Sequence, residues 1–159
     1  MPRAQVLAVR HGPSVPAGAR KKPGTSMGTV TAVSRVFDGS NSRAVGAARD
    51  FTTVFLLRAI VAGTSVGVLL LDRARLVVSE LVTNAVKYAR GRILLELQVQ
   101  DEVLLITVAD TTPALPVSRA HDPRRIGQHG LEIVRMLCRS VDVTLEPAGK
   151  RVTVHLNLH

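Results

Sequence analysis

The sequence predicts an α+β two-layer sandwich, in which a mixed, largely antiparallel sheet carries three helices on one face. Alternating apolar and polar segments indicate strands, and longer segments with apolar residues three or four positions apart indicate helices. These segments follow the order strand, helix, helix, strand, strand, helix, strand, strand. Two pairs of strands are joined by short polar turns, which favours antiparallel hairpins. A chain of 159 residues is long enough for one domain with a core of its own.

The N-terminal segment differs in composition from the rest of the chain. Residues 1–35 contain six Lys and Arg and no acidic residue, within a chain whose formal net charge is +9. We expect residues 1–28 to be a disordered basic leader and residues 29–159 to be the folded domain, and Met27 offers an alternative start. A basic leader can contact nucleic acid by neutralising phosphates. Because the chain has only four aromatic residues and no helix-turn-helix pattern, we expect no specific nucleic-acid surface.

Composition also excludes other classes of protein. The single cysteine, Cys138, rules out an internal disulfide and a multi-cysteine metal site, and its position on an apolar helix face indicates a core residue. The longest apolar run, residues 66–71, is too short to span a bilayer. No apolar signal-peptide core follows the N-terminal arginines. We therefore expect a cytoplasmic protein without a membrane partner.

The first strand is predicted at residues 29–37, which are rich in β-branched side chains and alternate in polarity. A turn follows, in which Ser40, Asn41 or Ser42 is expected to cap the next helix. That helix is predicted at residues 43–60, because its apolar residues recur at helical spacing.

A second helix is predicted from Asp72, as its cap, to Arg90. Two strands are expected next, at residues 92–100 and 103–110, joined by a polar turn. Three prolines then indicate a loop over residues 111–127. A third helix is predicted over "HGLEIVRMLCRS", and a hairpin around "PAGK" joins the last two strands, "VDVTLEP" and "KRVTVHLNL".

The second helix carries one polar stripe. Glu80, Thr83, Asn84 and Lys87 fall within an arc of about 100° on a helical wheel, and most of the remaining circumference is apolar. Such a stripe is either an ordinary solvent-exposed edge or the lining of a pocket. In a pocket, the Asn84 carboxamide would suit Mg²⁺, which prefers oxygen ligands, and Glu80 would be placed to act as a base.

Two further features favour the pocket. Asp110 ends a strand, and Gly127 and Gly130 precede the third helix. Glycines at such a position let the backbone approach a phosphate, and the free N–H groups of the helix start favour the anion. A Glu-x-x-x-Asn helix, a strand-end Asp and a Gly-x-x-Gly-Leu helix start are more specific together than any one of them alone.

The segments "VVSELVTNAVKYA", "ITVADTTP", "GQHGLEIVRML" and "PAGKRVTVHL" resemble the histidine-kinase-like (GHKL) ATPases, which share the Bergerat ATP-binding fold. The resemblance runs from about residue 35 to the end of the chain, and it is greatest to stand-alone anti-sigma factor serine/threonine kinases of the actinomycete type. It implies ATP and Mg²⁺ as cofactors. It also implies Glu80 as the catalytic base, Asn84 as the metal ligand and Asp110 as the acceptor for the adenine amino group.

The same resemblance implies a short phosphate-binding lid around Gly127 and Gly130. The nucleotide-binding residues that we expect are Asn84, Lys87, Asp110, Thr112, Arg124, Arg125, Gly127, His129, Gly130 and Leu131.

The function that the resemblance implies is a protein kinase in a partner switch. Such a protein phosphorylates a serine or threonine of a small antagonist protein and, in its other state, binds a sigma factor. We expect the docking surface on the first helix and the outer sheet edge, and pairing into a homodimer is typical of such regulators. A sensor histidine kinase would need a phosphoacceptor histidine upstream, where only His11 is present, in the leader.

A catalytically weak or inactive, nucleotide-gated protein-binding module is the alternative. Thr111, Thr112 and Pro113 follow Asp110, where the family usually has a glycine, and the lid segment 111–126 is short.

Overall fold

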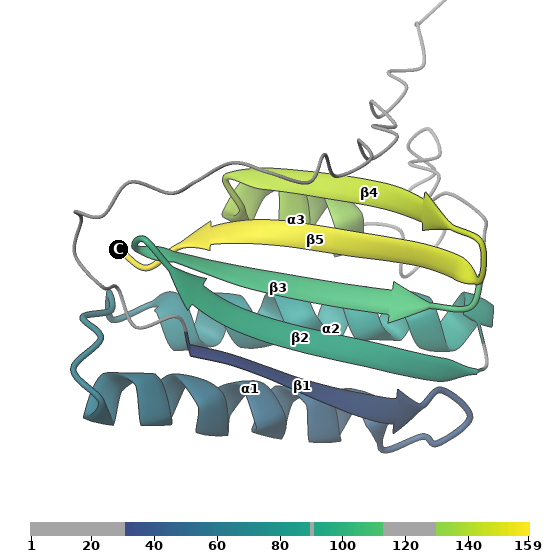
Figure 1. Cartoon of the computed structure of the whole chain (residues 1–159), viewed down its shortest axis with the longest axis horizontal. Helices are drawn as coiled ribbons and strands as arrows, with labels where there is room; N and C mark the ends of the chain where they lie inside the picture. Colours follow the sequence, from purple (N-terminus) through teal and green to yellow (C-terminus); the bar gives the residue numbers. More distant parts are fainter. Residues whose placement is uncertain (1–30, 90, 113–129) are drawn as a thin grey trace, which may run out of the picture.

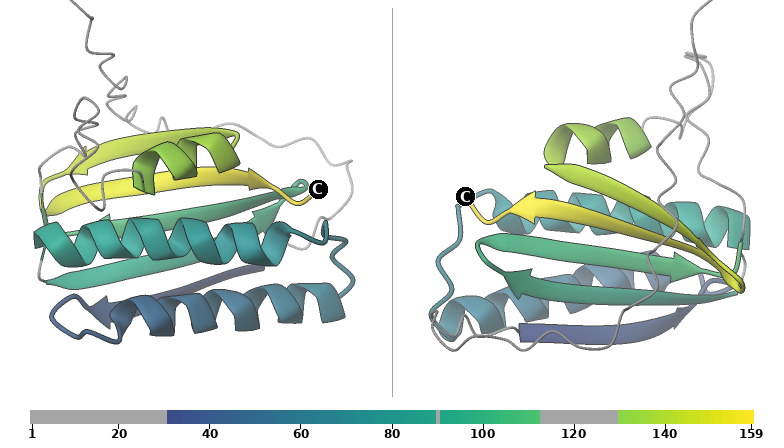
Figure 2. Two further views of the ribbon diagram at one scale, coloured as in Figure 1. Left: turned by 180° about the vertical axis from the view of Figure 1, so that it is seen from behind. Right: turned by 45° about the horizontal axis from the view of Figure 1, so that its top comes forward.

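The computed structural model describes residues 31–89, 91–112 and 130–159. In this part of the chain, five strands and three helices occur in the predicted order, and the helices cover one face of the sheet (Figures 1 and 2). The strands are β1 (Thr31–Asp38), β2 (Arg92–Gln100), β3 (Val103–Asp110), β4 (Ser140–Glu146) and β5 (Gly149–Asn157), and the helices are α1 (Ala44–Val61), α2 (Leu70–Ala89) and α3 (Gly130–Leu137). The predicted α+β two-layer sandwich is confirmed.

Some predictions fall outside the described residues. They concern the leader, residues 1–28, and four expected nucleotide contacts, which are Arg124, Arg125, Gly127 and His129.

The sheet has the strand order β1-β2-β3-β5-β4. All four neighbouring pairs among the described strands are antiparallel, so this part of the sheet is antiparallel throughout rather than mixed. The chain leaves β3, forms α3 and the edge strand β4, and then returns as β5 between β3 and β4. Strand β5 is therefore paired on both sides.

The core lies between the helices and the sheet. Alternate residues of β2 and β5 are buried on the side that faces the helices, as the period-two pattern predicts. Helix α2 covers the centre of the sheet, whereas α1 lies over β1 and β2 and α3 lies over β4 (Figure 2). The most completely buried large side chains are Leu56, Val77, Val78, Val82, Ile93, Leu95, Leu97, Leu104, Ile106, Val134, Val154 and Leu156.

Two predicted helix caps are wrong in detail. Arg43 is the N-cap of α1, and no side chain caps the helix; instead, the Asn41 side chain accepts a hydrogen bond of 2.9 Å from the Arg43 backbone N–H, one residue too early. Helix α2 begins at Leu70, so Asp72 lies in its first turn rather than at its cap. An acidic residue in the first turn still interacts favourably with the helix dipole.

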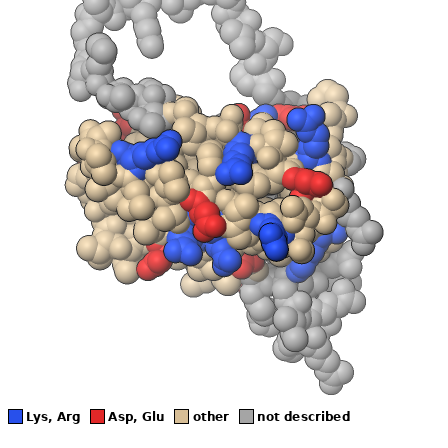
Figure 3. All heavy atoms as spheres, turned by 90° about the horizontal axis from the view of Figure 1, so that it is seen from below, with Lys and Arg blue, Asp and Glu red and all other residues tan. Residues whose placement is uncertain are grey.

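The outer face of α1 carries several exposed apolar side chains, among which Arg49, Asp50 and Arg58 are also exposed. Val54, Leu57, Ile60 and Val61 are each exposed by more than two fifths, although α1 also buries an apolar face against the core. Figure 3 shows the side of the molecule formed by α1 and β1, where basic and acidic side chains are scattered among neutral residues. This face therefore presents apolar surface rather than a continuous basic band.

Among the described helices, none is long and apolar enough to cross a membrane.

We expect the substitution Leu97→Ala to destabilise the domain by about 2–5 kcal/mol, because it opens a cavity in the core. Leu97 is fully buried on β2, beneath the helices. Urea unfolding followed by circular dichroism measures this as a lower midpoint. The control is Leu57→Ala on α1, where the side chain is 50% exposed, and it should leave the midpoint nearly unchanged. Equal losses in the two variants would contradict the assignment of β2 to the core.

Candidate functional site

The polar stripe of α2 lies at the border between core and surface. Glu80, Thr83 and Asn84 are half-buried, and Lys87 is exposed one turn further along. Within residues 31–89, 91–112 and 130–159, no protein group makes a hydrogen bond to the Glu80 carboxylate or the Asn84 carboxamide. Half-buried polar groups normally have partners. The two side chains are therefore available to a ligand.

The start of α3 packs against this stripe. A Cβ atom built on Gly130 would overlap the Oε2 atom of Glu80 and lie 3.0 Å from its Cδ atom. The carboxylate therefore lies against the backbone of the first residue of α3, and any side chain at residue 130 would require the end of the Glu80 side chain to move. The first N–H groups of a helix have no partners within the helix and favour an anion. The structure thus brings together Glu80 and Gly130, which the sequence places fifty residues apart.

Asp110 lies at the other end of the site. It is the last residue of β3, and its side chain is 3% exposed on the side of the sheet that faces the helices. Its Oδ1 atom accepts a hydrogen bond of 2.8 Å from the Thr112 backbone N–H. The Nζ atom of Lys150, directly across on β5, lies 2.9 Å from Oδ2 and 3.2 Å from Oδ1. Asp110 is therefore a buried carboxylate with a counter-ion.

The loop after Asp110 is attached to α2. The Thr112 hydroxyl donates a hydrogen bond of 2.9 Å to the backbone carbonyl of Tyr88, in the last turn of the helix, where carbonyls lack partners within the helix. On the other side, a Cβ atom at Gly149 would overlap the Asp110 carbonyl oxygen. The end of β3 is thus held between α2 and the β4–β5 turn.

These contacts arrange the site along α2. Glu80 marks the α3 end, Tyr88 marks the Asp110 end, and Asn84 lies halfway between them. Eight helical residues extend over about 12 Å, which is comparable to the length of an extended nucleoside triphosphate. This arrangement is compatible with the predicted order, in which Asp110 would contact the base and Glu80 would lie near the last phosphate.

The donor set fits Mg²⁺ bound together with phosphates. Among the described residues, no group of three or more His, Cys, Asp or Glu side chains could hold a metal ion by itself. Mg²⁺, however, often takes only one or two protein ligands and completes its octahedron with phosphate oxygens and water. The Asn84 carboxamide, which has no partner among the described residues, suits that role.

The other expected nucleotide-binding residues that the structure describes differ in the groups that they have available for a ligand. Leu131 packs its side chain against the core, so only its backbone N–H is available to a phosphate. Thr112 uses its hydroxyl hydrogen for the Tyr88 carbonyl and keeps acceptor capacity for a base or a water. Lys87 is exposed on the α2 stripe. The proposed nucleotide contacts of these three residues stay predictions.

Lys150 is the residue that sequence reasoning missed. The sequence predicts Lys150 as the first residue of the last strand, beside the "PAGK" turn, but gives it no role in the site; in the structure β5 begins at Gly149, and Lys150 lies within the strand opposite Asp110. The sequence does indicate an inward side chain, because Lys150 lies two and four positions before the buried residues Val152 and Val154, and alternate residues of a strand share one face.

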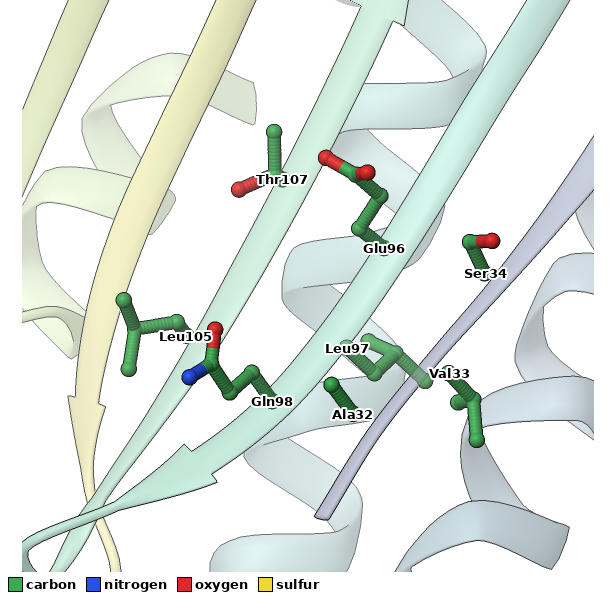
Figure 4. A pocket seen from close by; sticks show the side chains of 8 residues that line it. All are labelled: Ala32, Val33, Ser34, Glu96, Leu97, Gln98, Leu105 and Thr107. Atoms are coloured by element: carbon green, nitrogen blue, oxygen red, sulfur yellow. The ribbon is translucent and has the colours of Figure 1, made fainter. Parts of the chain in front are cut away.

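A shallow hollow on the opposite face of the sheet is separate from this site. It is lined by residues of β1, β2 and β3 and includes the outward-pointing Ser34, Glu96, Gln98 and Thr107 (Figure 4). Glu80, Asn84 and Asp110 belong to the helix-covered side, so the hollow shares none of the candidate residues.

Cys138 supplies no reactive group to the site. It is half-buried and packs against the core, as predicted. Burial raises the pKa of its thiol to about 11, so it is protonated at neutral pH.

Comparisons with known proteins identify a family for this chain. A family model described as histidine kinase-like ATPase domain matches residues 40–156. No curated protein matches the sequence. Among solved structures, the histidine kinase domain from the Erythrobacter litoralis EL346 blue-light activated histidine kinase is similar, with a TM-score of 0.46 and 21% identity. That match covers 67% of this chain and 61% of the solved chain, so this chain spans less than two thirds of it.

We expect Gly130→Ala to stabilise the domain less than a glycine-to-alanine change elsewhere in a helix, or to destabilise it by at most about 1 kcal/mol, because the new methyl group overlaps the end of the flexible Glu80 side chain, which must turn away. The matched control is Gly46→Ala in α1, where the nearest atom is 4.0 Å from the added Cβ. Relief of the entropic penalty of glycine should make that variant more stable by about 0.4–1 kcal/mol. Urea unfolding measures both variants.

A double variant tests whether Glu80 causes the clash. In a Glu80→Ala background, Gly130→Ala should raise the stability of the domain about as much as Gly46→Ala does, because the overlapping carboxylate is gone. Additive effects of the two substitutions would show that Glu80 and Gly130 are not in contact.

Proposed function

The chain belongs to the histidine kinase-like ATPase family, and we propose that it is a Mg·ATP-dependent serine/threonine-protein kinase that acts as an anti-sigma factor in a partner switch. ATP binding follows from the family. The finer proposal is supported by one observation above all. The carboxylate of Glu80 lies against the first residue of α3, one turn from the carboxamide of Asn84, and neither group has a hydrogen-bond partner among the described residues.

In this proposal, the residues of α2 and α3 divide the work of phosphoryl transfer. Asn84 and the backbone N–H groups at the start of α3 orient the phosphates, and Glu80 accepts the proton of the attacking hydroxyl. The serine or threonine oxygen forms a bond to the γ-phosphorus, the bond to the β–γ bridging oxygen breaks, and ADP leaves. Bound Mg²⁺ would neutralise phosphate charge. Phosphoryl transfer needs mainly this positioning and neutralisation.

The proposed partners are a small antagonist protein, which accepts the phosphate, and a sigma factor. The apolar side chains on the outer face of α1 support a docking surface there, since Val54, Leu57 and Val61 are exposed without covering residues from the described part of the chain. Clusters of exposed apolar residues often mark protein interaction sites. A homodimer through the same region stays part of the proposal.

A nucleotide-gated binding module with little catalysis is the second candidate. It is favoured by the contacts of Asp110, whose carboxylate is already engaged by Lys150 and Thr112. A weakened base contact would limit nucleotide affinity without changing the protein-binding surface.

Nucleotide binding is tested by thermal unfolding with ATP, with and without Mg²⁺. At 100 times its dissociation constant, a ligand adds roughly 2.7 kcal/mol of stability, which raises the melting temperature visibly in a domain of this size. Asn84→Ala should abolish the part of the shift that depends on Mg²⁺. Gln98→Ala, which removes a carboxamide from the outer face of the sheet, is the control and should keep the full shift. No shift at millimolar ATP in the unmodified chain would contradict the proposed site.

Catalysis is tested by Glu80→Gln, which keeps the size of the side chain and removes its basicity. We expect ADP formation from Mg·ATP to fall by about 10²-fold or more, with the dissociation constant of Mg·ATP nearly unchanged. Glu96→Gln, on the far side of the sheet, should leave the rate unaltered. Binding without measurable turnover in the unmodified chain would favour the second candidate.

A further inference from the structure

The inner rows of β3 and β5 end in a charged pair. Four pairs of residues face the helices across these strands, and three of them are apolar. The pairs are Leu104 with Leu156, Ile106 with Val154, Val108 with Val152, and Asp110 with Lys150. Both charged side chains are nearly inaccessible to water, with 3% of Asp110 and 7% of Lys150 exposed. An apolar pair in place of Asp110 and Lys150 would stabilise the domain at least as well, because a buried ion pair loses the hydration of two charges.

The ion pair leaves Asp110 one place for a ligand. An ionised carboxylate has about four acceptor positions. Oδ1 accepts from the Thr112 backbone N–H and from Lys150, and the Lys150 ammonium also lies in ion-pair contact with Oδ2. Among the contacts of the described residues, an acceptor position on Oδ2 stays open. Two donor groups from two directions, Thr112 N–H and Lys150 Nζ, also prevent the carboxylate from rotating.

We propose that Lys150 is a specificity-determining residue of the nucleotide site, which holds the Asp110 carboxylate so that it accepts one N–H from a 6-aminopurine base. The inference rests on the proposed function, in which Asp110 contacts the base. Lys150 acts through Asp110 and is therefore a positioning residue. Its place in the sheet supports this, because the register puts it directly opposite Asp110 and Gly149 lets the two strands approach.

The consequence is discrimination at C6 of the purine. The amino group of adenine donates to the open position on Oδ2. Hypoxanthine carries a carbonyl oxygen there, which would face a carboxylate oxygen that cannot turn away and has no hydrogen to donate. A site built to accept a hydrogen bond rejects an analogue that cannot supply one. ATP should therefore bind more tightly than ITP.

The experiment compares the dissociation constants of Mg·ATP and Mg·ITP by isothermal titration calorimetry on the full chain. The unmodified protein should prefer ATP, and Lys150→Met should reduce that preference by about tenfold, the effect of one charge-assisted hydrogen bond. Lys150→Arg should retain most of the preference, because a guanidinium also donates to both carboxylate oxygens. Where Lys150→Met fails to fold, Lys150→Gln keeps one donor for Asp110 and should show an intermediate loss.

Arg151→Met provides the matched control. Arg151 is the next residue of β5, points to the opposite face, and pairs with Glu96 and Glu146 there. Its loss removes a cation from the same strand and should leave the ratio of ATP to ITP affinity unchanged.

Three outcomes would overturn the inference. If Lys150→Met is folded, binds Mg·ATP and keeps the full preference, Lys150 is only structural, and the proposed nucleotide site stands. If the unmodified chain binds ATP and ITP equally, Asp110 does not recognise C6 of the base. If it binds neither, the proposed function fails together with the inference.

Discussion

The pairing of β5 with β3 is the constraint on which the rest of the structure depends. These strands are separated in the sequence by α3 and β4, yet they lie side by side near the centre of the sheet. For β5 to enter that position, β4 must occupy the edge, and α3 must lie beside α2 on the helical layer. This arrangement brings Gly130 against Glu80 and places Lys150 opposite Asp110. One non-local pairing therefore assembles both ends of the candidate site.

The same pairing explains why polar groups are tolerated in an apolar setting. Helix α2 buries Val78, Leu81 and Val82 against the sheet, so any polar side chain on its flank is costly unless it finds a partner. Asp110 has that partner within the protein, in Lys150 and the Thr112 backbone. Glu80 and Asn84 have none among the described residues, although they are half-buried. Asp110 is therefore held in place by the protein itself, whereas Glu80 and Asn84 are available to a ligand.

Local features of the fold were readable from the sequence. Strands β2 and β3 were predicted with their observed bounds, because alternation and the polar Asp101–Glu102 turn are local signals. The contact between Glu80 and Gly130 was suggested only through the family resemblance, since nothing local joins two helices fifty residues apart. Lys150 was missed because its environment depends on which strand lies beside β5. The alternation along β5 indicates that the Lys150 side chain points inward, like those of Val152 and Val154. Only the register with β3 shows that it lies opposite Asp110.

The residue that departs from the family pattern has a structural role of its own. A glycine after Asp110 would leave the end of β3 freer to move, but it would lack the hydroxyl that Thr112 donates to the Tyr88 carbonyl. That bond ties the loop after β3 to the end of α2, the helix that carries Asn84 and Glu80. Because the Thr112 backbone N–H also binds Asp110, the Asp110 end and the Glu80 end of the candidate site are connected through a single helix. The threonine therefore stiffens the site while leaving an acceptor position on Asp110 open, and the departure by itself is compatible with nucleotide binding.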